Sequence, residues 1–205
     1  YVEIDTENGL ATGMITKIED RKNYIIRQSA RHRFKKHIVA ANLDQALLII
    51  TFSQPRTSLG FVDRFLLNTQ MYDIPTVLIF NKQDIYTAKD MAHYKDAKAL
   101  YERLGYGSLL VSAISGHNIA ALQDLMKDKT SLVVGHSGVG KSTLIKVLSG
   151  VHQPTAGTIK VAGNEVKFGS PREATAAGIG TVYQDLALNA LTSVTRNFFL
   201  GNELK

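Results

Sequence analysis

The residues best suited to chemistry lie in one glycine-rich segment in the second half of the chain. It reads Gly135-His136-Ser137-Gly138-Val139-Gly140-Lys141-Ser142 and matches the phosphate-loop pattern of a glycine, four residues and then Gly-Lys-Ser. Glycines let the backbone amides turn toward one point, and the helix start that follows also favours an anion. We expect this segment, together with Thr143, to bind the phosphates of a nucleotide.

Two side chains of this loop have distinct expected roles. Lys141 is expected to reach the β and γ phosphates, and the hydroxyl of Ser142 is expected to bind Mg²⁺. His136 either touches phosphate or faces solvent, and we favour solvent. An apolar strand pattern precedes the loop and a helical pattern follows it, so a chance glycine-rich turn is the weaker interpretation.

Two further motifs suit the recognition of guanine. Asn81-Lys82-Gln83-Asp84 follows an apolar run directly, and Ser112-Ala113 follows another. A carboxylate at Asp84 can accept hydrogen bonds from N1–H and the N2 amine of guanine, whereas adenine offers neither donor there. A backbone amide at Ser112 or Ala113 can face the guanine carbonyl. Each of these two motifs alone is weak evidence, and Asn-Lys-Xaa-Asp often caps a helix. Both of them, however, directly follow an expected strand, as the phosphate loop does.

The elements around these motifs alternate between strands and helices. The strands are expected at Gln45–Phe52, Thr76–Phe80, Leu109–Val111 and Ser131–Val134. Helix faces are marked by apolar residues between them: Leu59, Val62, Phe65 and Leu66; Met91, Tyr94, Tyr101 and Leu104; Ile119, Leu122, Leu125 and Met126; Leu144, Ile145 and Leu148. This alternation predicts an α/β fold with three layers, in which a mostly parallel sheet lies between helices.

The two ends of the chain differ from this pattern. Residues 1–38 predict a small β appendage, with a hairpin formed by Met14–Ile18 and Tyr24–Arg27. After Gly150 we expect a second hairpin, 158–162 with 165–168, then a short helix from Ser170 and a strand over 180–183. Residues 39–205 are expected to form the nucleotide-binding domain.

The order of the motifs resembles that of a known family. The base motifs come before the phosphate loop, as in the circularly permuted GTPases of small-subunit ribosome assembly, the RsgA/YjeQ family. The resemblance covers about residues 2–145. It implies that residues 1–38 are the last part of an OB-fold module and that the ligands are GTP or GDP with Mg²⁺. The family's switch Thr, Asp-Thr-Pro-Gly motif and zinc module are not found.

The last third of the chain is similar to a different class of P-loop protein. Segments 141–150, 154–159 and 180–184 resemble the ATPase subunits of sugar-type ABC transporters. That resemblance implies that Gln184 is a glutamine that senses Mg²⁺ and the γ-phosphate, and it makes Gln184 the one catalytic candidate. We therefore expect an engineered chimera, with 39–145 GTPase-like and 146–205 ABC-like.

The composition of the chain limits the kinds of site, location and partner that we expect. The chain has 205 residues, no cysteine and a formal net charge of +6, so disulfides and cysteine-bound zinc are excluded. No apolar run is long enough to cross a membrane, and a cytoplasmic location is expected. A basic cluster between Arg27 and Lys36 could contact RNA, but we favour a solvated linker and expect ribosome or RNA binding to be absent in this form.

Three hypotheses about function follow. The first is a guanine-nucleotide-binding protein with weak or no hydrolysis, because no metal-holding acid or water-orienting residue is identifiable. The second is an active NTPase, a GTPase or an ATPase. The third is a designed protein that tests the recombination of P-loop folds and in which nucleotide binding is incidental.

Overall fold

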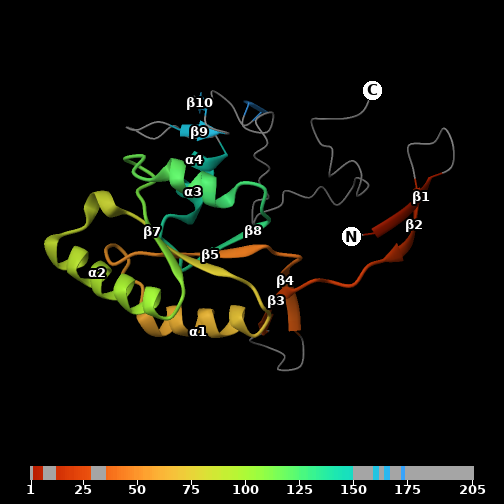
Figure 1. Cartoon of the computed structure of the whole chain (residues 1–205), viewed down its shortest axis with the longest axis horizontal. Helices are drawn as coiled ribbons and strands as arrows, with labels where there is room; N and C mark the ends of the chain where they lie inside the picture. Colours follow the sequence, from red (N-terminus) through yellow and green to blue (C-terminus); the bar gives the residue numbers. More distant parts are fainter. Residues whose placement is uncertain are drawn as a thin grey trace.

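The core of the molecule is a four-stranded parallel sheet, shown in Figure 1. The computed structural model describes residues 2–6, 13–28, 36–149, 159–161, 164–166 and 172–173. Within these, the sheet has the order β7-β6-β5-β8. Its strands are β5 (Gln45–Ile50), β6 (Thr76–Phe80), β7 (Gly107–Leu110) and β8 (Ser131–Gly135). Every residue of the central strand β5 is buried, as the apolar run Ala46–Ile50 predicts, and the polar side chain of Gln45 donates hydrogen bonds to Leu125 O and the Ser131 hydroxyl.

Helices cover both faces of this sheet. Alternate side chains of β5 point to opposite faces: Leu48 and Ile50 pack with the first pair of helices, and Leu47 and Ile49 pack with the second. The first pair is α1 (Leu59–Gln70) and α2 (Ala88–Arg103), and the second is α3 (Ile119–Met126) and α4 (Lys141–Leu148). The predicted three-layer α/β fold is therefore confirmed.

Most residues of the predicted helix faces are at least partly buried, and the two exceptions are Leu59, which is 40% exposed, and Leu104. Tyr94 and Tyr101 of α2 lie in the core, but Leu104 is 63% exposed and follows the end of that helix. The α2 helix begins at a capping box, in which the Thr87 hydroxyl accepts a hydrogen bond from Asp90 N and the Asp90 carboxylate accepts one from Thr87 N. A short 3-10 helix, η1 (Gln83–Ile85), precedes it.

The N-terminal strands pair differently from the prediction. They are β1 (Val2–Thr6), β2 (Gly13–Ile18), β3 (Tyr24–Gln28) and β4 (Lys36–Ala41). β2 pairs with β1 and β3 pairs with β4, both antiparallel, so the expected β2–β3 hairpin is wrong. Figure 1 shows the β1–β2 pair standing away from the sheet, and every residue of β2 is exposed.

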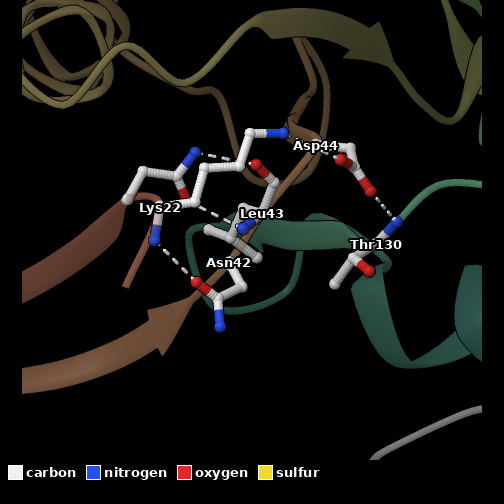
Figure 2. Close-up of polar contacts among 6 residues, drawn as sticks. Lys22, Asn42, Leu43, Asp44 and Thr130 are labelled. Carbon is white, nitrogen blue, oxygen red and sulfur yellow. Dashed lines mark hydrogen bonds and ion pairs between the residues drawn. The ribbon is translucent and has the colours of Figure 1, made fainter. Parts of the chain in front are cut away.

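The polar residues between β2 and β3 explain this difference. They bond to the residues before β5 instead of closing a hairpin, as Figure 2 shows. The amide of Lys22 donates to the side chain of Asn42 at 2.9 Å, and Asn23 exchanges two hydrogen bonds with the backbone of Leu43, each 2.8 Å long. The Asn23 side chain is buried by this contact.

Asp44 extends the same network to a third segment. Its carboxylate accepts a hydrogen bond from Thr130 N at 2.8 Å and from the Lys22 amine at 3.4 Å (Figure 2). Thr130 lies just before β8, so Asp44 joins the β2–β3 loop, the start of β5 and the start of β8. We call these contacts of Lys22, Asp44 and Thr130 the clasp. They lie at the edge of the sheet opposite the phosphate loop.

Less of the C-terminal region is described. β9 (Ile159–Val161) pairs with β10 (Asn164–Val166) in an antiparallel hairpin, as the sequence predicts, and β9 lies against α3. The predicted strand over 180–183 and Gln184 lie outside the described residues, as does most of the predicted helix from Ser170. Among the described residues, no helix is both long and apolar enough to cross a membrane.

Candidate nucleotide-binding site

The phosphate loop connects β8 to α4 at the carboxyl edge of the sheet. Gly138 and Gly140 have backbone φ angles of +80° and +93°, which residues other than glycine rarely adopt. Gly135 needs to be a glycine for another reason: a Cβ there would lie 2.6 Å from the carbonyl oxygen of Ile49. The backbone can therefore curve closely around a small anion at the start of α4.

Lys141 lies across this loop. Its amine donates hydrogen bonds to the carbonyl oxygens of Gly135 at 2.7 Å and His136 at 2.5 Å. Burial lowers the pKa of this amine, because partial removal from water disfavours the charged form. Ser142 and Thr143 are exposed in the first turn of α4, next to the loop. The predicted phosphate-binding residues are thus together in space.

Asn81 links the phosphate loop to both base motifs. Its side-chain amide donates to the carbonyl oxygen of Val139 at 3.0 Å, and its side-chain oxygen accepts from the amide of Ala113 at 3.3 Å. Asn81 is only 1% exposed. The three motifs, which are separated in the sequence, therefore meet at one buried side chain.

The predicted base-recognition residues also lie together. The hydroxyl of Ser112 donates a hydrogen bond to the Asp84 carboxylate, and Gln83 N donates to the carbonyl of Val111 at 3.2 Å. Asp84 is exposed at the carboxyl end of β6, whereas Ser112 is fully buried. Lys82 has a left-handed backbone with φ of +67°. This arrangement holds an acidic group beside the loop that carries Ala113.

Sequence reasoning missed a loop that supports the site. The loop, Thr51–Thr57, follows β5 and is closed by two hydrogen bonds: Thr57 N to Thr51 O at 2.7 Å, and Thr51 N to the Thr57 hydroxyl at 3.2 Å. Its Gln54 carbonyl accepts a hydrogen bond from the Lys82 amine, and Pro55 lies against Gly138. No motif marked this loop, and the only sequence signal was its polar turn after a buried strand.

His136 is exposed, as predicted, but it also has a packing partner. Its ring centroid lies 3.9 Å from that of Phe61 in α1. The phosphate loop is therefore in contact with α1 as well as with the Thr51–Thr57 loop. Phe61 carried no functional signal in the sequence, because an aromatic residue on a helix is most often part of the core.

A metal at this site would need ligands from the nucleotide. The described residues contain no group of three or more His, Asp or Glu side chains that could hold a metal ion. The exposed hydroxyl of Ser142 at the start of α4 suits Mg²⁺ only when phosphate oxygens complete the shell, because Mg²⁺ prefers six oxygens. The residues present thus fit a metal that arrives with a triphosphate.

Comparison with known proteins gives one consistent family. The RsgA GTPase family model matches residues 18–167. The chain is 43% identical over 146 residues to the small ribosomal subunit biogenesis GTPase RsgA of Flavobacterium psychrophilum, and 46% identical over 142 residues to that of Bacteroides fragilis. These alignments cover 71% and 69% of this chain but only 45% and 46% of the relatives, so the chain spans about half their length.

Solved structures agree with the sequence relatives. YjeQ from Thermotoga maritima has a TM-score of 0.61 and 32% identity over 71% of this chain and 48% of its own. YloQ, described as a circularly permuted GTPase, has a TM-score of 0.58 and 30% identity, and the match covers 83% of this chain and 56% of its own.

These matches bear on the two resemblances drawn from the sequence. The family model continues to residue 167, beyond residue 145, where the GTPase-like part was expected to end. The ABC-type resemblance and the chimera find no support in these comparisons. The resemblance to the permuted GTPases is confirmed: the chain belongs to the RsgA GTPase family.

Proposed function

We propose that this chain binds GTP and GDP at the carboxyl edge of its sheet, with Mg²⁺ bound between Ser142 and the phosphates. The observation that carries the proposal is the double hydrogen bond of Asn81. One end of its amide contacts the phosphate loop at Val139 and the other contacts the Ser112-Ala113 loop. Groups that suit phosphates and groups that suit a base are therefore held at a fixed separation.

The base preference follows from Asp84. A carboxylate accepts hydrogen bonds only, so it complements the two donors of guanine and leaves adenine without a partner. The Ser112 hydroxyl already donates to one carboxylate oxygen and so orients the group. Binding ATP would bury the other Asp84 carboxylate oxygen without a donor, at a cost of about 1–3 kcal/mol. Guanine should therefore be preferred over adenine.

Hydrolysis is proposed to be weak. Lys141 is placed to stabilise charge on the β and γ phosphates, and Mg²⁺ would neutralise charge between them. Asn81, the buried amide that joins the motifs, is however engaged in hydrogen bonds on both sides and so is not free to orient an attacking water. The expected outcome is tight product binding with slow turnover.

Calorimetric titration with GDP, GTP and ADP tests this proposal. Lys141→Ala should weaken GDP binding by about 2–4 kcal/mol, because it removes a charged contact to phosphate. Lys146→Ala is the matched control, since Lys146 lies on the same helix away from the loop. Equal affinity of the wild type for GDP and ADP, or an unchanged affinity in Lys141→Ala, would refute the assignment.

We infer a partner from the relatives. The proteins of Flavobacterium psychrophilum and Bacteroides fragilis are named small ribosomal subunit biogenesis GTPases, which argues against the expectation that this form does not bind the ribosome. The net charge of +6 also suits a phosphate-rich partner. We propose that the chain, with GTP bound to it, binds the small ribosomal subunit.

Co-sedimentation with purified small subunits tests the partner. Binding should be saturable with a non-hydrolysable GTP analogue and weaker with GDP, and it should fall steeply as salt rises. Co-sedimentation that does not depend on the nucleotide would show only charge attraction, and this would count against the proposal.

The hypothesis of an ABC-like segment after residue 145 stays a prediction. It has a specific consequence, because in that case Gln184 would sense Mg²⁺ and the γ-phosphate and would support hydrolysis by an active NTPase. Gln184→Ala should then lower the rate of GTP or ATP hydrolysis, with Gln153→Ala as the control. A rate that is the same in both variants would remove Gln184 as a catalytic candidate. If the chain folds stably but binds no nucleotide, this would instead favour the third hypothesis, a designed protein in which nucleotide binding is incidental.

A further inference from the structure

A cavity outside the nucleotide site lies between the start of α1 and the middle of α2. It has a volume of about 550 Å³. Sites for small molecules have volumes of about 300–1,000 Å³, so the cavity can hold a compact organic ligand. It is on the face of the sheet covered by α1 and α2, and none of the predicted site residues lines it.

The wall of the cavity is mostly apolar. Phe52 is 5% exposed, and its ring is stacked at 5.7 Å on that of Phe80 in β6. Leu59 and Leu100 line the cavity and are 40% and 37% exposed. An aromatic ring would remove these side chains from water and could stack on Phe52.

The charges around the cavity balance one another. Arg56 and Asp96 both line it and both are exposed, so a carboxylate or an ammonium ligand would gain from one and lose from the other. A neutral ligand meets no such opposition. The lining therefore favours a neutral aromatic molecule.

One polar atom beside the cavity lacks a partner. His93 lines the cavity, and its Nδ1 is buried without any hydrogen bond. Its ring lies 6.1 Å from Phe52. A buried polar atom without a partner is unfavourable, so a ligand atom that reaches this nitrogen would be stabilised by it. A hydroxyl group both donates and accepts, and it can satisfy Nδ1 in either tautomer of the imidazole.

The same cavity shares a wall with the nucleotide site. Phe52, Arg56 and Thr57 line it, and all three belong to the Thr51–Thr57 loop. The opposite side of that loop touches the nucleotide site, where Gln54 O accepts from Lys82 and Pro55 lies against Gly138. Because two internal hydrogen bonds close the loop, we expect a shift on one side of the loop to move the other side as well.

We propose that this cavity is a second binding site, which takes a neutral small molecule built on an aromatic ring with a hydroxyl group, with the hydroxyl on His93 Nδ1. Occupancy of the site changes the affinity for guanine nucleotide through the Thr51–Thr57 loop. This coupling rests on the proposed nucleotide function, whereas binding of the phenolic ligand does not.

Two probe molecules of similar shape test the binding. By saturation-transfer NMR and titration, 4-methylphenol should bind the wild type about threefold to tenfold more tightly than toluene, which lacks the hydroxyl. His93→Phe keeps a ring against Phe52 but removes the nitrogen, so the two probes should bind it alike. Leu100→Trp should fill the cavity and prevent both probes from binding. Leu104 lies outside the cavity, just after the same helix, so Leu104→Trp should bind both probes as the wild type does.

Equal binding of the two probes by the wild type, or a preference for 4-methylphenol that persists in His93→Phe, would overturn the site. The coupling between the cavity and the nucleotide site is measured in a separate experiment, which compares the affinity for GDP with and without saturating 4-methylphenol. A change of about fivefold or more is expected, in either direction, and it should vanish in Leu100→Trp. An unchanged GDP affinity overturns the coupling, and failure of GDP to bind at all overturns the nucleotide assignment while leaving probe binding as an independent result.

Discussion

At the scale of single residues, Asp84 has the sharpest expected effect. Asp84→Asn replaces one acceptor with a donor that faces the donors of guanine, so GDP binding should weaken by about 1–3 kcal/mol or more. ADP binding should not weaken, because adenine gains no hydrogen bond from the carboxylate and the neutral amide is easier to bury. Paired titrations of wild type and variant measure the difference, and Gln83→Asn is the neighbouring control. Similar losses for GDP and ADP would mean that Asp84 acts on the fold and not on the base.

Gly140 gives a second test at the same scale. A Cβ there would lie 2.4 Å from the side-chain nitrogen of Asn81, and the φ of +93° disfavours alanine in addition. Gly105 has nearly the same φ, +88°, and no atom lies within 4 Å of the position that a Cβ would take there, so Gly105→Ala carries the backbone strain alone.

Both variants should lose about 1–2 kcal/mol of stability from the backbone. Only Gly140→Ala should displace Asn81 and weaken GDP binding in addition. Thermal unfolding and GDP titration on the two variants separate the effects. If Gly105→Ala weakens GDP binding as much as Gly140→Ala does, the contact with Asn81 is not what matters.

At the scale of elements, the clasp predicts a dependence of stability on pH. The hydrogen bond from Thr130 N, and then Lys22, lower the pKa of Asp44 below its ordinary value. A carboxyl whose pKa is lower in the folded state stabilises the fold above its unfolded pKa of about 3.9, and this contribution is lost as pH falls through the folded pKa. The wild type should therefore exceed Asp44→Asn in stability at neutral pH.

Urea unfolding between pH 7 and pH 2 measures this difference. The gap between wild type and Asp44→Asn should close as the pH falls below about 4. Asp20→Asn, an exposed acid in the β2–β3 loop, is the control and should show a smaller gap at neutral pH. A gap between wild type and Asp44→Asn that does not vary with pH would show that the charge of Asp44 contributes nothing to the clasp.

The elements themselves differ in how well a sequence predicts them. The strands at Thr76–Phe80 and Ser131–Gly135 follow from apolar runs bounded by polar residues, and their parallel direction follows from the helices between them. The position of β8 next to β5 was not predicted. The partner of β2 was not predictable in this way. Alternating patterns in β1, β2 and β3 permit several pairings, and the choice depends on Asn23 and Leu43, which are twenty residues apart.

The whole molecule should unfold unevenly. β5 lies inside the sheet and is buried along its length, whereas β2 is exposed throughout and pairs with β1 alone among the described strands. A two-stranded pair has little stability of its own. Hydrogen exchange followed by mass spectrometry should show β2 peptides exchanging many times faster than β5 peptides. Equal protection of the two would indicate that β1 and β2 are covered in solution.

The candidate site was predictable in its parts but not in its assembly. The phosphate loop and Asp84 have residue types that chemistry requires, so their identity is visible in the sequence. The contact between Asn81 and Val139 spans 58 residues, and no local pattern announces it. The hydrogen bond between Lys82 and Gln54 and the ring contact between His136 and Phe61 are likewise visible only after folding, because each joins residues far apart in the sequence.

The strand order also sets a sequence of events during synthesis. β5, β6 and β7 come first along the chain and are neighbours, whereas β8, on the other side of β5, is made at least twenty residues after β7 ends. Until Ser131–Gly135 leaves the ribosome, the apolar strand β5 has one edge without its partner, and such an edge can pair with other chains. The loop that would bind nucleotide emerges immediately after that strand. Under the proposed function, a guanine nucleotide would therefore stabilise the newly made chain only after this strand has emerged.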